Sequence, residues 1–130
     1  MKTRVLTAVL ALGLVLASPP AATSRSLEPL VLGWERFFTI SWESWEETGR
    51  PVVGGYIRNE SGFTAAKVQL LVEALDPAGH VVDQRVSWLG SQLTAGTRAY
   101  FEVPAPPRPA AYRVSVFAFD WVQTASIQTP

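Results

Sequence analysis

Short stretches of alternating apolar and polar residues, separated by breaks that contain Gly or Pro, recur along most of the chain. The clearest spans residues 66–75, where Val68, Leu70, Val72 and Ala74 alternate with neighbours that are mostly polar. Successive side chains of a strand point to opposite faces of a sheet, so this pattern predicts a strand with one buried and one wetter face. Comparable stretches predict further strands at residues 51–59, 80–88, 97–103 and 112–122.

An aromatic segment near residues 30–45 fits two periodicities. Trp34, Phe38, Trp42 and Trp45 have helical spacing, whereas Trp34, Phe38, Ile40 and Trp42 would share one face of a strand. The abundance of aromatic and β-branched residues favours a pleated, half-buried surface. We therefore predict a strand over residues 36–46.

The breaks between these strands carry recognisable turn chemistry. Residues 76–79, Asp-Pro-Ala-Gly, are typical of a type I turn that joins a hairpin. The pair Gly54 and Gly55 inside a strand indicates a bulge or a closely approaching backbone. Asn59 fits an N-x-S glycosylation pattern, but at a strand end the residue is more typical of a turn.

Several short strands without a convincing amphipathic helix predict an all-β fold. Their number, about six or seven, and the turn signals between them favour an antiparallel β-sandwich with two sheets over an α/β fold. No internal repeat is apparent in the sequence, which indicates a single domain.

Residues 55–61, 68–76, Gly79 and 94–101 together carry a weak motif: a Gly before a strand, an Asn turn, a strand ending in Asp-x-x-Gly, and a later strand with Phe. In this order they resemble the FxLYD-type domains of exported bacterial proteins. Residues 72–76 stand where that family has Phe-x-Leu-Tyr-Asp, with Asp76 kept and Leu75 in place of Tyr. The resemblance implies an immunoglobulin-like sandwich and export, and it supplies no catalytic residues.

The N-terminal residues have the pattern of a targeting segment. Lys2 and Arg4 precede an apolar stretch at residues 5–17, which is followed by small and turn-forming residues. This pattern predicts a cleaved secretory signal peptide at residues 1–23. Its 13 apolar residues fall short of the ~20 that span a bilayer, so a retained anchor is the less favoured alternative.

Cleavage would leave a tether at residues 24–35, the sandwich at 36–122 and a tail at 123–130. We accordingly expect an exported protein, periplasmic or secreted, without a stable membrane anchor.

Composition excludes several functions. The chain of 130 residues has no cysteine, balances 11 Lys and Arg against 11 Asp and Glu, and contains one histidine. It thus lacks the basic excess of a nucleic-acid-binding protein, and the single His80 has no evident partners for a metal site. We expect no cofactor and no metal.

An enzyme is also not favoured by the sequence. No Gly-x-Ser-x-Gly stretch occurs, and Glu43, Glu46 and Glu47 form the densest acidic group. A small hydrolase using these glutamates is one hypothesis. Their position at a strand end makes an ordinary solvated face the simpler interpretation.

Aromatic residues offer the best candidates for a contact surface. There are six Phe, five Trp and three Tyr, concentrated near residues 34–45 and 112–121. In the last predicted strand Val114, Val116 and Ala118 share one face, which leaves Phe117, Phe119 and Trp121 on the other. These aromatics either pack under the N-terminal strand or form an exposed platform, and the sequence leaves both open.

We predict a non-catalytic interaction or structural module whose partner is another envelope or secreted protein. The candidate contact residues are Trp42, Trp45, Phe117, Phe119 and Trp121. The alternative is a carbohydrate-binding module that stacks sugars on Trp42, Trp45 and Trp121.

Overall fold

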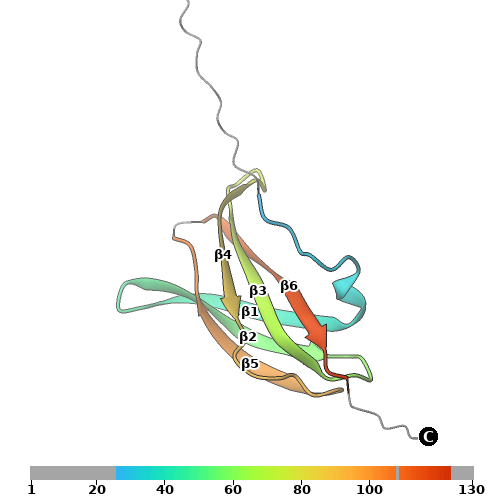
Figure 1. The fold of residues 1–130 in the computed structure, drawn as a ribbon. Coiled ribbons are helices and arrows are strands. Elements are labelled where there is room, and N and C mark those ends of the chain that lie inside the picture. The colour runs from blue at the N-terminus through green and yellow to red at the C-terminus, as the bar shows by residue number, and fades with distance from the viewer. Residues whose placement is uncertain (1–25, 108, 124–130) are drawn as a thin grey trace, which may run out of the picture.

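The computed structural model describes residues 26–107 and 109–123, and these form an all-β fold (Figure 1). A short 3-10 turn, η2 (Trp34–Arg36), precedes the first strand. The six strands are β1 (Phe38–Glu47), β2 (Arg50–Asn59), β3 (Ala65–Leu75), β4 (Val81–Trp88), β5 (Arg98–Pro104) and β6 (Ala111–Trp121). All six predicted strands are confirmed, with bounds shifted by two residues at most. The predicted signal peptide at residues 1–23 lies outside the described residues, as does all but Gln123 of the predicted tail.

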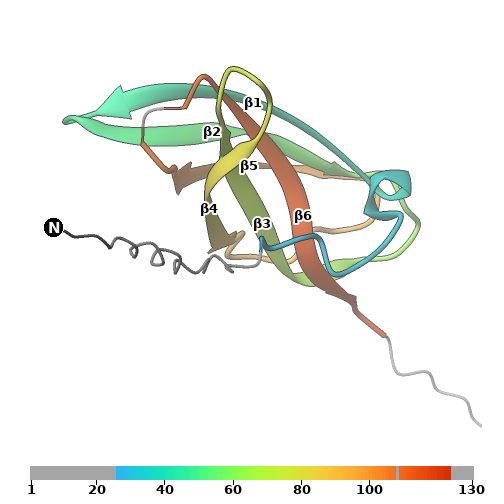
Figure 2. The same cartoon turned by 90° about the horizontal axis from the view of Figure 1, so that it is seen from above.

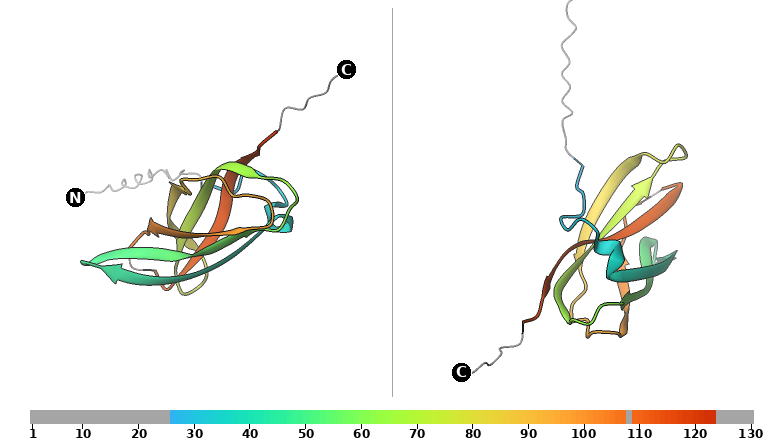
Figure 3. Two further views of the ribbon diagram at one scale, coloured as in Figure 1. Left: turned by 90° about the horizontal axis from the view of Figure 1, so that it is seen from below. Right: turned by 90° about the vertical axis from the view of Figure 1, so that its right-hand side faces the viewer.

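The strands form two antiparallel sheets of three strands each. The sheet β1-β2-β5 is called sheet A here, and the sheet β4-β3-β6 is called sheet B. β1 and β2 form one hairpin and β3 and β4 another, while the remaining connections pass from one sheet to the other. The β1–β2 hairpin reaches out beyond sheet B (Figures 1 and 3).

The core lies between the inner faces of the two sheets. Val53, Ile57 and Phe101 contribute from sheet A, and Leu70 and Val116 from sheet B. Ile57 and Phe101 alternate with exposed neighbours, which follows the period of two that the sequence displays. Because the chain has no cysteine, this packing and the hydrogen bonds of the loops hold the sheets together.

A bulge in β6 changes which aromatic side chains reach the core. Gln69 pairs with Ala118 whereas the next residue, Leu70, pairs with Val116, so Phe117 is an extra residue on β6. One extra residue reverses the alternation of a strand. Phe119 and Trp121 consequently pack against the same core that buries Val116.

The predicted sharing of faces along the last strand is therefore wrong beyond Phe117. Phe119 and Trp121 do not lie opposite Val114 but join the core from the far side of the bulge. The Phe119 ring lies 4.9 Å from the Phe38 ring, and Trp121 stacks on Phe38 at 6.1 Å. Of the two predicted alternatives, packing against the N-terminal strand is confirmed for Phe119 and Trp121, whereas Phe117 does not join the core cluster.

The segment predicted as a tether lies against sheet B. The side-chain amide of Gln84 donates to the carbonyl of Leu27 and accepts from its N–H, each at 2.8 Å. Farther along, the N–H of Leu30 donates to the carbonyl of Phe117 on β6. Figure 2 shows this segment crossing β6. Residues 27–30 thus extend from the outer face of sheet B at β4 to β6.

Beneath this segment the outer face of sheet B is buried. Leu71 is fully buried although it lies outside the core cluster, and Glu73 is 5% exposed. Arg113 donates to Glu73 at 2.7 Å and Gln84 donates to it at 2.8 Å. The buried carboxylate is therefore both paired and hydrogen-bonded, as burial of a charge requires.

The side chain of Asn59 joins the loops at one end of the molecule. Asn59 is fully buried, and its Nδ2 donates to the carbonyls of Phe63 at 2.7 Å and Leu93 at 3.0 Å. Its Oδ1 accepts from the N–H and the hydroxyl of Ser61. The turn interpretation of Asn59 is confirmed. A glycan on Nδ2 would displace hydrogen bonds that the fold uses.

We predict that Asn59→Ala lowers the free energy of unfolding by roughly 2–4 kcal/mol, because two buried carbonyls lose their donor. Urea denaturation of the chain without residues 1–23 measures the change. Ser61→Ala is the matched control and should cost about 1 kcal/mol, since it removes one partner and leaves the amide donors in place. Equal losses in both variants would contradict the central role of the amide.

Candidate functional site

The outer face of sheet A stays exposed and carries large aromatic side chains. Tyr56 and Tyr100 alternate with the core residues of β2 and β5, so they point away from the core, and they are 40% and 52% exposed. Arg58 and Glu102 share this face with them by the same alternation. Sheet A therefore presents aromatic and charged groups together to solvent.

Strand register brings these residues together from three strands. Ser41 of β1 lies opposite Tyr56 of β2, which lies opposite Tyr100 of β5. Two residues along, Glu43 and Glu102 flank Gly54 on either side. The result is a shallow cavity of about 300 Å³, here called the aromatic hollow, which is lined by Ser41, Trp42, Glu43, Trp45, Gly54, Gly55, Tyr56 and Tyr100.

The two glycines make room for this arrangement. A Cβ on Gly54 would collide with the indole ring of Trp45, so the missing side chain lets that ring lie down on the sheet. A Cβ on Gly55 would collide with the backbone of Ser41 and Trp42 on the neighbouring strand. The pairing of β1 with β2 is continuous here. Of the two predicted explanations for the glycines, close backbone approach is confirmed and the bulge is wrong.

Polar hydrogens of the hollow are directed at carboxylates. The Trp45 Nε1–H donates to Glu47 at 3.4 Å, and the Tyr100 hydroxyl donates to Glu102 at 2.7 Å. This hydrogen bond to Glu102, with burial and the negative charge of Glu102 adding to it, raises the pKa of Tyr100 to about 12. Tyr100 therefore stays a neutral donor at physiological pH.

A cation already sits on one ring of the hollow. The guanidinium of Arg98 lies 4.2 Å from the centre of the Tyr56 ring. The rings of Tyr56 and Tyr100 meet edge to face, with 5.4 Å between their centres. Tyr56 is thus held between an arginine and a second aromatic ring, which fixes its orientation.

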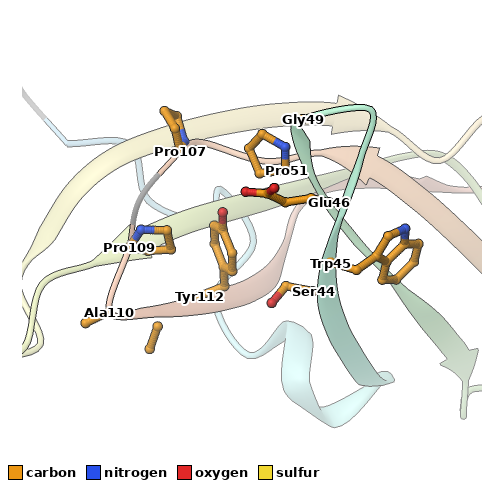
Figure 4. A pocket seen from close by; sticks show the side chains of 10 residues that line it. Ser44, Trp45, Glu46, Gly49, Pro51, Pro107, Pro109, Ala110 and Tyr112 are labelled. Carbon is orange, nitrogen blue, oxygen red and sulfur yellow. The ribbon is translucent and has the colours of Figure 1, made fainter.

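A second cavity lies on the other side of the β1–β2 hairpin (Figure 4). It has a volume of about 470 Å³ between the hairpin and the proline-rich loop before β6. Glu46 and Tyr112 line it, while Trp45 points to the opposite side of the hairpin. Burial, followed by the nearby Glu46, raises the pKa of Tyr112, whose hydroxyl donates to the carbonyl of Pro106.

The predicted contact residues do not form one surface. Trp42 and Trp45 line the aromatic hollow, and Trp42 is 37% exposed. Phe119 and Trp121 instead pack on Phe37 and Phe38. Phe117 lies at the bulge, half-buried.

Trp121 also lines a separate apolar cavity of about 590 Å³, together with the exposed Phe63. The contact residues predicted from the sequence therefore belong to two separate aromatic regions of the structure.

Sequence reasoning missed Tyr56, Tyr100 and Glu102. Tyr56 is the single aromatic residue of β2, Tyr100 stands beside the core residue Phe101 in β5, and 43 residues separate the two tyrosines in the chain. A usable signal was present, because each tyrosine shares its alternation with charged residues instead of core residues. The two tyrosines come together because β2 pairs with β5, and no local sequence pattern predicts that pairing.

The three glutamates considered for a hydrolase do not share one site. Alternation along β1 places Glu43 and Glu47 on the outer face and Glu46 on the side of the second cavity. Among the described residues, no group of three or more His, Asp or Glu side chains could hold a metal ion.

His80 belongs to the predicted turn after β3, which is confirmed. Asp76 accepts from the N–H groups of His80 and Ala78, and Gly79 has φ 89°. The backbone hydrogen bond from His80 is the main cause of the lowered pKa of Asp76. These contacts are those of a tight hairpin turn.

No helix in the described part of the chain has the length and apolar character needed to cross a membrane. No family model, curated protein or solved structure matches this chain.

We predict that Gly54→Ala and Gly55→Ala differ sharply in stability. Gly54→Ala meets the movable tip of the Trp45 side chain and, at 3.0 Å, the carbonyl oxygen of Phe101, so it should cost about 1 kcal/mol while shifting the fluorescence of Trp45. Gly55→Ala meets backbone and should cost more than about 2 kcal/mol. Urea denaturation followed by tryptophan emission compares them. Similar costs for the two variants would show that the glycines have the same role.

We also predict that the Tyr100 phenol titrates near pH 12 in the folded chain, above its ordinary value of 10.0. Because folding raises this pKa, the stabilisation from the hydrogen bond to Glu102 is complete below pH 10 and is lost as the pH rises toward 12. Carbon-13 NMR of labelled tyrosine follows the titration. In Glu102→Ala the pKa should fall back toward 10, and an unchanged value would rule out Glu102 as the cause.

Proposed function

We propose that this chain is an exported, non-catalytic binding module that contacts a protein partner through the aromatic hollow. The observation that carries the proposal is the difference between the two outer faces. The outer face of sheet B buries Leu71 and Glu73 beneath the chain's own N-terminal segment. The outer face of sheet A keeps Tyr56 and Tyr100 about half exposed.

Exposed aromatic rings at a rigid site are typical of binding surfaces. Tyr and Trp offer large contact areas and lose little conformational freedom on binding, since each has few rotatable bonds. Here the rings are held in place by Arg98, by Gly54 and by hydrogen bonds to Glu47 and Glu102. A surface that is ordered before binding costs less to occupy.

An immunoglobulin-like sandwich of the FxLYD type is part of this proposal. The order β1-β2-β5 against β4-β3-β6 resembles strands A-B-E and C′-C-F of immunoglobulin-like domains. Tyr112, near the start of β6, donates its hydroxyl to the carbonyl of Pro106 just upstream, as in the tyrosine corner of such domains. Export, to the periplasm or beyond the cell, rests on the N-terminal sequence pattern.

Binding of carbohydrate is the second candidate function. Tyr56 and Tyr100 expose ring surface on which a sugar could stack, and Glu43 could accept hydrogen bonds from hydroxyl groups. Trp42 lies on the opposite side of β1 by alternation. Trp121, which was grouped with Trp42 in the sequence, packs on Phe38 and Phe119 in the other aromatic region.

The test is affinity capture of the tagged mature chain from native envelope extract. Replacing Trp45 and Tyr100 by Ser should remove a captured protein, because both side chains line the hollow. The matched control replaces Phe63 and Trp88, which are also exposed aromatics but lie elsewhere. Circular dichroism establishes that both double variants fold.

Loss of the partner from the hollow variant alone supports the proposal, and calorimetry with the purified partner then measures its affinity. A partner retained by the hollow variant and lost from the control would place the contact surface around Phe63 or Trp88. Saturable binding of soluble glycans by the wild type, without any captured protein, would favour the carbohydrate function.

A further inference from the structure

β1 is an outer strand of sheet A, so one of its two edges faces no other strand of that sheet. The carbonyl of Pro51 and the N–H of Asn59, both on β2, bond to Ala105 and Thr97, which flank β5. Backbone groups alternate in direction along a strand, so the even-numbered residues of β2 bond to the odd-numbered residues of β1. The even-numbered residues of β1 at positions 40–46 consequently direct their N–H and C=O groups away from β2.

The other three edges of the two sheets are each obstructed. β5 is the shortest strand, and Pro104 at its end has no N–H to donate. The edge of β6 contains the bulge at Phe117, whose carbonyl accepts from the N–H of Leu30. On β4 the N–H of Gln84 donates to the carboxylate of Asp83 at 2.8 Å.

β1 has none of these obstructions. It pairs with β2 over ten residues without a shift of register and contains no proline. The tip of the β1–β2 hairpin also extends beyond sheet B (Figure 1). A free edge is a row of unpaired donors and acceptors, and an unobstructed one can pair with a further strand.

The free edge of β1 also borders the two cavities described above. Ser41 and Glu43 line the aromatic hollow on the outer face, and Ser44 and Glu46 line the second cavity on the other face. The side chains of an added strand would alternate between the same two faces. Strand addition takes its affinity from backbone hydrogen bonds and its specificity from pockets that accept alternate side chains. The edge of β1 offers both.

We propose that an extended segment of the protein partner adds to sheet A along the free edge of β1. Its backbone bonds to Trp42 and Ser44, and its side chains reach the aromatic hollow and the second cavity in alternation. This inference rests on the proposed function, because it names how the same partner binds beside the hollow. A second copy of β1 suits the edge less well, since it would add three more glutamates beside a strand that has no Lys or Arg.

The experiment titrates the chain without residues 1–23 with the blocked peptide acetyl-Lys-Thr-Val-Thr-Val-Thr-Lys-amide. Its β-branched residues favour the extended conformation, and its lysines keep it soluble. Proton–nitrogen NMR spectra follow the backbone N–H groups of β1. We expect saturable shifts of Trp42 and Ser44 that are at least about twice those of Ser41 and Glu43, because the latter two are already bonded to β2.

Two substitutions of Ser44 test whether its outward N–H is needed. Ser44→Pro removes this donor, leaves the hydrogen bonds to β2 in place and should weaken binding of the peptide about tenfold or more. Ser44→Ala keeps the N–H and is the matched control, with an affinity within about twofold of the wild type. Circular dichroism establishes that both variants fold, and the alternating shifts of the wild type decide the question independently of them.

No saturable shift of the β1 backbone, or shifts confined to the Trp45 indole, would overturn the strand pairing. Equal affinities of Ser44→Pro and Ser44→Ala would overturn it as well. Alternating shifts that grow with chain concentration in the absence of peptide would identify a second copy, and not a partner, as the occupant.

The capture experiment separates this inference from the function on which it rests. If strand pairing fails while the hollow variant still loses its partner, the proposed binding function stands and only the mode of contact is wrong. Failure of both experiments removes the function and the added strand together.

Discussion

The buried amide of Asn59 is the interaction on which the arrangement of the two sheets depends. Asn59 ends β2 in sheet A, and the carbonyl of Leu93 that it binds also accepts from Ala65 at the start of β3 in sheet B. The carbonyl of Leu93, in the loop between β4 and β5, is thereby bonded to a strand of each sheet. In a chain without disulfides, a fully satisfied buried amide of this kind specifies a single arrangement, because any other leaves polar groups unpaired.

The inner faces of the two sheets pack against each other, and the two outer faces differ in how far they are covered. Part of the outer face of sheet B is covered by the chain itself, with Gln84 binding the backbone of Leu27 much as a neighbouring strand would. Sheet A has a continuous exposed surface, and Gly54 allows the indole of Trp45 to lie flat on it. The same small fold thus covers part of one outer face and leaves aromatic rings exposed on the other, and this asymmetry is the physical basis for proposing a function for sheet A.

The chemistry of the aromatic hollow favours recognition over reaction. Its carboxylates accept hydrogen bonds from aromatic side chains, and alternation along β1 points Glu46 away from Glu43 and Glu47. The rings are held by contacts within the protein, so a ligand would find them already in position. We therefore interpret the site as a binding surface that is ordered before its ligand arrives.

The sequence by itself determined the strands, the turn at Asp76 and the role of Asn59, because each depends on local alternation or on side chains that bind nearby backbone. Only the tertiary structure decided which aromatic side chains are exposed. A single extra residue at Phe117 turns Phe119 and Trp121 into the core, and the pairing of β2 with β5 joins Tyr56 to Tyr100. Bulges and strand register arise from contacts between strands that are distant in the sequence. The alternation of apolar and polar residues along a single strand therefore does not predict them.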